Sequence, residues 1–93
     1  MVFNLKGKTA LVTGASGGIG SAVARALHSQ GAELIINGTR SSELEKLAAE
    51  LGNKVHVLQG DLADTKIIGC LAVQAEKISD NGIDILVNNA GIT

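Results

Sequence analysis

Four short apolar runs alternate along the chain with longer segments in which apolar residues recur every three or four positions. The runs are continuous, which is typical of parallel strands buried on both faces. They cover residues 9–12, 33–36, 54–59 and 83–87. The segments between them predict three helices, at residues 21–30, 43–51 and 65–79.

The helix boundaries have their own signals. Ile19, Val23 and Leu27 lie four apart, as on one face of a helix. Ser42 with Glu45 forms a candidate capping box at the start of the second helix. Short loops between alternating strands and helices imply right-handed crossovers and a parallel sheet. We therefore predict an α/β fold, a Rossmann-type doubly wound sheet with strand order 3-2-1-4, and no domain boundary within residues 1–93.

The loops that follow the predicted strands differ from the others in composition. They read TGASGGIG, NGTR, GDL and NNAG, and are rich in Gly, Asn, Asp and Arg. The remaining loops, around Gly31, Gly52 and Gly82, have ordinary turn composition. Because the carboxyl ends of parallel strands meet at one edge, this asymmetry predicts a single ligand cleft there.

The first of these loops fits a pyrophosphate. Gly14 permits a sharp exit from the strand, Gly18 the close approach of a ligand, and Gly20 the close packing of the following helix. The N-terminus of that helix supplies N–H groups, and Ser16 adds a hydroxyl. A glycine cluster alone also occurs in plain tight turns, but the strand before it and the helix after it favour a dinucleotide site.

The second loop discriminates between cofactors. NAD-binding proteins usually carry a carboxylate near the end of the second strand, whereas this chain has Asn37, Thr39 and Arg40. A guanidinium binds a 2′-phosphate through charge-assisted hydrogen bonds, so NADP(H) is favoured. The alternative is that Arg40 is a surface residue paired with Glu43.

The third and fourth loops supply further candidates. Asp61 can accept a hydrogen bond from the adenine amino group, with Leu62 against the ring; the alternative is a turn carboxylate. Asn88 and Asn89 can bridge backbone groups of adjacent strands or touch the cofactor ribose, and for Asn88 we favour the structural role. Together with the first two loops, these residues predict one continuous dinucleotide cleft.

Composition and charge exclude several other functions. A net charge of −1 and a pI near 6.0 do not provide the basic surface that nucleic acid or an anionic membrane requires. The apolar runs are shorter than a membrane span and no signal peptide is visible, so we expect a cytoplasmic protein. Cys70 is the single cysteine, and neither His28 nor His56 has metal-ligand spacing around it.

These motifs resemble those of the short-chain dehydrogenase/reductase family. TGASGGIG matches the family's TGxxxGxG, Asp61 and Leu62 its adenine-side pair, and NNAG its motif after the fourth strand. Within the family, FNLKGKTALVTGASGGIG and DILVNNAGIT most resemble bacterial 3-oxoacyl-[acyl-carrier-protein] reductases. This resemblance implies an NADPH-dependent, usually tetrameric reductase of fatty-acid biosynthesis with an acyl-carrier-protein-linked substrate. It implies cofactor contacts at Gly14, Ala15, Ser16, Gly17, Ile19, Gly20, Thr39, Arg40, Asp61, Leu62, Asn89, Ala90 and Gly91.

Two departures from the family pattern bear on activity. Many NADP-preferring relatives carry a basic residue where this chain has Gly17, so phosphate selectivity would rest on the second loop. The family's catalytic Tyr, Lys and Ser are not matched, and the chain contains no tyrosine. We therefore expect residues 1–93 to be the dinucleotide-binding part of a Rossmann domain without its catalytic half, inactive alone and weakly stable because of an unpaired strand edge.

Other functions remain open at this point. One is a non-catalytic nucleotide-binding module, and another is a short-chain dehydrogenase with a different carbonyl or alcohol substrate. A methyltransferase that uses S-adenosylmethionine is disfavoured, because that cofactor carries no phosphate for Arg40 to bind.

Overall fold

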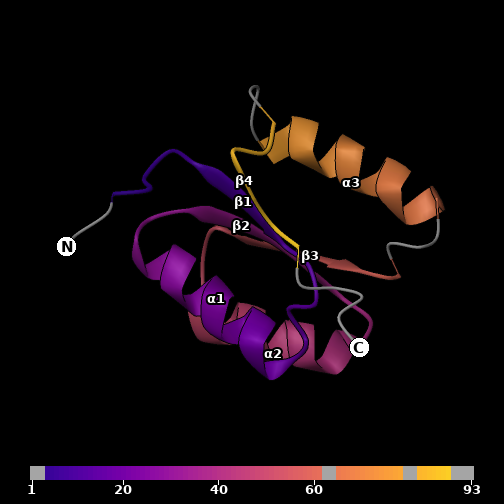
Figure 1. Ribbon diagram of the computed structural model, residues 1–93, viewed down its shortest axis with the longest axis horizontal. Helices are drawn as coiled ribbons and strands as arrows, with labels where there is room; N and C mark the ends of the chain where they lie inside the picture. Colours follow the sequence, from indigo (N-terminus) through magenta and orange to yellow (C-terminus); the bar gives the residue numbers. More distant parts are fainter. Residues whose placement is uncertain (1–3, 62–64, 79–81, 89–93) are drawn as a thin grey trace.

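Strands and helices alternate along the whole described chain. The structure is a computed structural model and describes residues 4–61, 65–78 and 82–88. Its elements, labelled in Figure 1, are β1 (Thr9–Val12), α1 (Gly18–Ser29), β2 (Glu33–Gly38), α2 (Ser41–Leu51), β3 (Val55–Gln59), α3 (Thr65–Ile78) and β4 (Ile85–Val87).

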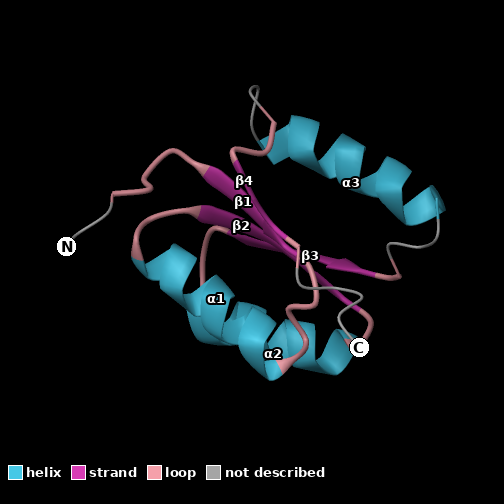
Figure 2. Cartoon of the chain, viewed as in Figure 1, coloured by secondary structure: helices cyan, strands magenta, loops and turns pink. Residues whose placement is uncertain are grey.

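The four strands form one parallel sheet in the order β3-β2-β1-β4, which confirms the predicted fold class. Each crossover carries a helix, because parallel neighbours cannot be joined by a tight hairpin. α1 and α2 cover one face of the sheet and α3 covers the other (Figure 2). The glycine loop between β1 and α1 therefore lies beside the central strands.

The two sheet faces have separate apolar cores. Ala10, Val12, Leu34 and Ile36 point toward α1 and α2, where Leu44 and Leu47 pack against them. Leu11, Ile35 and Leu58 point the other way, toward Ile67 and Leu71 of α3. Every residue of β1 is buried, as the unbroken apolar pattern predicts, whereas the edge strands β3 and β4 are only partly covered.

Several predicted boundaries were wrong by one to three residues. α1 begins at Gly18, inside the glycine loop, and ends at Ser29. The predicted last residue of the third helix, Ser79, lies outside the described residues. β2 continues to Gly38, because its last two residues still pair with β3. β4 begins at Ile85; directly before it, Asp84 N donates to Thr9 O and the Asp84 carboxylate accepts a hydrogen bond from the Thr9 amide, both at 2.9 Å.

The predicted capping box and the apolar stripe of α1 also need correction. α2 begins at Ser41 after Arg40, and no side chain caps its first turn, so Ser42 and Glu45 do not form the box. In α1 the buried positions are Gly20 and Ala24, whereas Ile19 is 74% exposed. Position 20 needs glycine because a Cβ there would lie 2.2 Å from the Gly14 carbonyl oxygen, whereas Leu27 of the predicted stripe is partly buried and packs against the core.

Candidate functional site

The glycine loop turns sharply from β1 into α1 and leaves the start of the helix open. Gly14 has φ +66°, a conformation that costs glycine little, and its carbonyl accepts a hydrogen bond from Gly17 N at 3.1 Å. Gly17 caps α1 without a side-chain hydrogen bond. A Cβ built on Gly18 would meet no atom within 4 Å. An exposed helix N-terminus of this kind can receive an anion.

Gly20 has a packing role. A Cβ at this position would lie 2.2 Å from the Gly14 carbonyl oxygen and 2.9 Å from the Ala15 Cα. The first turn of α1 therefore rests directly on the backbone of the loop, and only glycine fits. The three glycine roles inferred from the sequence thus separate into a turn (Gly14), an open face (Gly18) and a close helix contact (Gly20).

Main-chain hydrogen bonds join the ends of all four strands. Ala15 N donates to Asn37 O at 2.8 Å, linking the glycine loop to β2. Gly60 N donates to Gly38 O at 2.9 Å, linking β2 to the loop after β3. On the other side, Thr13 N donates to Val87 O at 3.0 Å. The carboxyl ends of the four strands thus meet at one edge, as predicted, over the residues that the structure describes.

The Thr13 hydroxyl extends that last link. Its Oγ1 lies within hydrogen-bond distance of two acceptors, Val87 O at 3.2 Å and Asn88 Oδ1 at 3.3 Å, which share its one hydrogen. Asn88 therefore connects β4 to β1, the structural role expected for it. Leu62, Asn89, Ala90 and Gly91, also expected at the cleft, lie outside the described residues.

Around the glycine loop, the remaining predicted residues have different exposures. Ala15 is buried and Ser16 is half-buried, with its Oγ close to the Gly38 backbone: a Cβ on Gly38 would lie 2.6 Å from it. Gly17 and Ile19 are exposed. The loop therefore presents its backbone and one apolar side chain outward, while Ser16 and Ala15 fasten it to β2.

Beyond β2, the side chains expected to select the cofactor face solvent. Thr39 and Arg40 are both exposed, and Arg40 precedes the first residue of α2. Arg40 forms no ion pair within residues 4–61, 65–78 and 82–88, and the ion-pair partner of Glu43 is Lys46, at 3.7 Å. The alternative pairing of Arg40 with Glu43 is thus not formed. Asp61 is exposed, directly after Gly60.

A groove between α1 and α2 extends from the glycine loop. Its volume is about 280 Å³, and its walls include Gly17, Gly18 and the charged side chains of Arg25, Lys46 and Glu50. None of those three was singled out in the sequence. Ser21 and Arg25 follow Gly17 at helical spacing, and this stripe was the one available signal.

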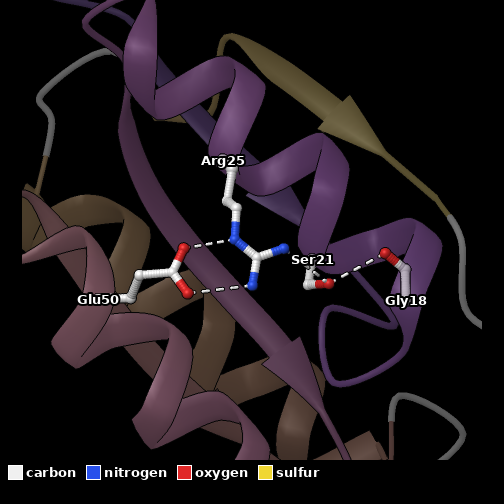
Figure 3. Close-up of polar contacts among 4 residues, drawn as sticks. All are labelled: Gly18, Ser21, Arg25 and Glu50. Carbon is white, nitrogen blue, oxygen red and sulfur yellow. Dashed lines mark hydrogen bonds and ion pairs between the residues drawn. The ribbon is translucent and has the colours of Figure 1, made fainter.

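Arg25 links the two walls of this groove, as Figure 3 shows. Its guanidinium pairs with the Glu50 carboxylate through Nε and, at 3.1 Å, through a second nitrogen. It also donates to Ser21 Oγ at 3.4 Å, and the Ser21 hydroxyl donates to Gly18 O at 3.0 Å. The hydrogen bond from Arg25 holds the pKa of the Glu50 carboxyl below its usual value.

The sequence placed Asn37 in the second loop beside Thr39 and Arg40 but gave no sign of its structural role inside the sheet. It occupies the penultimate position of β2 and is 2% exposed, and its side-chain amide donates to Leu58 O and Gly60 O. An Asn-Gly pair is typical of a turn, and nothing in the local sequence indicates that the amide donates to the carbonyls of Leu58 and Gly60.

The histidines and the cysteine lie away from this edge. His28 Nε2 contacts Asn53 O at 2.8 Å, and His56 Nε2 lies 2.6 Å from Glu33 Oε2, so both have structural partners. Cys70 is exposed on α3. In the part of the chain that the structure describes, no group of His, Cys, Asp and Glu could hold a metal ion, and no helix is long and apolar enough to cross a bilayer.

The chain is similar to known proteins over almost its whole length. Residues 8–93 match the sequence profile of a family described as short chain dehydrogenase. Nodulation protein G of Rhizobium sp. (strain N33) is 53% identical over 92 residues, covering 99% of this chain and 37% of that protein. A 3-oxoacyl-[acyl-carrier-protein] reductase FabG of Rickettsia bellii (strain RML369-C) is 44% identical, with 99% and 36% covered.

Solved structures agree with the sequence relatives. The crystal structure of 3-ketoacyl-(acyl-carrier-protein) reductase from Brucella melitensis, complexed with NADH, superposes with a TM-score of 0.86 at 32% identity, over 96% of this chain and 36% of that one. The chain therefore spans just over a third of the length of the proteins it matches.

Proposed function

The chain belongs to the short-chain dehydrogenase family, and from this membership we propose that it forms the NADP(H)-binding part of a carbonyl reductase. The substrate class we propose is a 3-oxoacyl group carried on acyl-carrier protein, as the name of the FabG relative suggests. Nodulation protein G is more similar to this chain but carries a different name. The proposed substrate class therefore rests only on the name of a relative, whereas the proposed cofactor rests on the residues of the site.

One observation carries the cofactor proposal: the open N-terminus of α1 stands at the edge where all four strands end. Gly17 and Gly18 are exposed, and no atom lies within 4 Å of a Cβ built on Gly18. A pyrophosphate can therefore approach the backbone N–H groups of the first turn. The residues present fit a dinucleotide in this respect, and the bound cofactor would supply the hydride.

Thr39 and Arg40 would decide between the two nicotinamide cofactors. They lie beyond β2, where a carboxylate that binds the ribose hydroxyls would otherwise be expected. Arg40 is exposed and keeps its guanidinium out of the ion pairs of the described residues, so it can contact a 2′-phosphate at no cost in broken pairs. Asp61, after β3, would accept a hydrogen bond from the adenine amino group.

The reducing step itself needs groups beyond those assigned here. The chain has no tyrosine, and a carbonyl reduction requires a proton donor near the substrate oxygen. We assign residues 1–93 to binding and orienting the cofactor, and we propose that they carry no reductase activity alone.

The cofactor proposal is tested by Arg40→Glu in the full-length protein, with Lys8→Glu as the matched control. Lys8 is an exposed cation directly before β1, at the opposite edge of the sheet. Loss of charge-assisted hydrogen bonds worth about 1.5 to 3 kcal/mol should weaken NADPH binding roughly 10-fold to 100-fold. NADH binding should stay within about twofold, since NADH carries no 2′-phosphate. Equal losses in both variants would refute the assignment.

The substrate proposal needs a separate measurement. With NADPH saturating, the full-length protein should reduce 3-oxoacyl chains on acyl-carrier protein with a higher kcat/KM than a sugar ketone. A preference for the sugar ketone would point to a different member of the family. Binding of NADPH without turnover of any carbonyl compound would favour a non-catalytic nucleotide-binding role.

A further inference from the structure

The side-chain amide of Asn37 is almost completely buried. It lies at the end of β2, 2% exposed, with buried Ile36 before it in the strand. Burying an amide costs free energy unless its polar atoms find partners inside the protein. A residue kept polar here must therefore make specific contacts.

Both N–H groups of the Asn37 side chain are used. Its Nδ2 donates to Leu58 O at 2.8 Å and to Gly60 O at 3.2 Å. Leu58 belongs to β3, and Gly60 to the loop that follows it. The amide thus spans the point at which β3 ends and fixes the direction in which the chain leaves the sheet.

The main chain of Asn37 makes a third link in the opposite direction. Its carbonyl accepts a hydrogen bond from Ala15 N at 2.8 Å, in the glycine loop. The following residue, Gly38, accepts from Gly60 N at 2.9 Å. Asn37 therefore touches the loop proposed for the pyrophosphate and the loop proposed for the adenine, and it stands two residues before Thr39.

We propose that Asn37 is a positioning residue for the adenosine half of the dinucleotide. It does not touch the ligand; it holds Gly60, and hence Asp61, in fixed relation to the glycine loop, so that the three loops receive the adenosine as one preformed unit. Preformed sites bind more tightly because less loop ordering is left to binding. This inference rests on the proposed dinucleotide function.

The test replaces Asn37 by Leu in the full-length protein. Leucine has nearly the same shape but no donors, so Leu58 O and Gly60 O lose their side-chain partner. Asn37→Ala serves as a second variant in case the leucine does not fit. The matched control is Leu34→Ala, a buried change in the same strand away from the carboxyl edge, which lowers stability without touching the loops.

The expected result distinguishes positioning from mere stabilisation. The Kd of NADPH and that of adenosine 2′,5′-bisphosphate should each rise roughly tenfold in the Asn37 variants, corrected for folded fraction, and stay near wild type in Leu34→Ala. The kcat/KM for reduced nicotinamide mononucleotide, which lacks the adenosine, should remain unchanged. Equal effects on both half-molecules, or equal losses in Leu34→Ala, would overturn the proposal.

Amide hydrogen exchange separates this inference from the proposed function. In the unliganded Asn37 variants the Gly60 amide should exchange at least about tenfold faster than in wild type. Its acceptor is Gly38 O in β2, and without the Asn37 side chain the loop after β3 is less firmly held to β2. Unchanged protection of Gly60 would overturn the positioning role whatever the ligand. Failure of the wild-type protein to bind NADPH would instead refute the dinucleotide function.

Discussion

Two glycines of the same helix turn should respond to alanine in opposite ways. Gly18 and Gly20 both lie in the first turn of α1. The proposed variants are Gly18→Ala and Gly20→Ala, each of which adds one methyl group. A Cβ at Gly18 meets nothing within 4 Å, whereas a Cβ at Gly20 would lie 2.2, 2.7 and 2.9 Å from backbone atoms of Gly14 and Ala15. Alanine at Gly20 therefore tests the packing of α1 on the loop, whereas alanine at Gly18 tests the approach of a ligand.

The cost at Gly20 follows from the atoms that it meets. All three are main-chain atoms, so no side chain can rotate away, and α1 must retreat from the loop by roughly 1 Å to restore ordinary contact. Overpacking of this kind costs typically 1 to 3 kcal/mol, and we expect about 3 kcal/mol here. At Gly18, alanine should leave stability unchanged or raise it by up to about 1 kcal/mol, because a helix favours alanine over glycine.

The assay combines urea unfolding with NADPH titration of both variants in the full-length protein. Gly20→Ala should lose stability, and its remaining folded fraction should also bind NADPH weakly, since the loop has moved. Gly18→Ala should keep its stability and still bind NADPH about tenfold or more weakly, because its methyl group occupies the space proposed for the pyrophosphate. A stable Gly20→Ala, or a Gly18→Ala that binds like wild type, would refute the reasoning.

Three further substitutions test the surrounding structure. Because the pKa of Glu50 is lowered in the folded state, its stabilising contribution is present above its unfolded pKa and is lost as pH falls through the folded pKa. Urea unfolding should therefore find wild type more stable than Glu50→Gln at neutral pH and equal to it in strong acid, and a gap that persists in acid would contradict this. Asp84→Ala removes the acceptor of the Thr9 amide and should cost about 1 to 2 kcal/mol, with faster exchange at Thr9; unchanged exchange would show that β1 does not depend on this contact. Leu44→Ala should cost about 2 to 5 kcal/mol in urea unfolding, because Leu44 is the fully buried residue of α2 in the core against the sheet, and a loss below 1 kcal/mol would mean that this contact does not hold the helix.

The sequence was sufficient for the fold and for the edge at which the site lies. Element order and strand order follow from alternating apolar runs and crossover rules, which depend on many residues at once. The extension of β2 to Gly38 was missed because the dipeptide Asn37-Gly38 has the local signature of a turn. That signature was overruled by contacts with β3, which lie more than 20 positions away in sequence.

The errors within α1 and α2 have a similar origin. Ile19 fits an apolar stripe by spacing, but the stripe that faces the sheet is the one with small residues, Gly20 and Ala24, since α1 rests on the backbone of the loop. Ser42 has the right chemistry for a cap, yet the cap position is Arg40, two residues earlier, and α2 begins at Ser41. Apolar periodicity identifies a helix, but which of its residues are buried depends on the sheet and loops against which the helix packs.

The carboxyl edge is held together by contacts that hardly depend on the exposed side chains around it. Ala15 N donates to Asn37 O and Gly60 N donates to Gly38 O, and neither of these main-chain hydrogen bonds involves a side chain. Side-chain identity matters where a Cβ would not fit, as at Gly20, Gly38 and Gly60, or where an amide supplies the link, as at Asn37. Exchanges at the exposed Arg40 or Asp61 should therefore alter ligand preference at little cost in stability. Chains with this fold can thus change cofactor and substrate preference while keeping the same loop framework, which is why the framework was readable from sequence and the substrate was not.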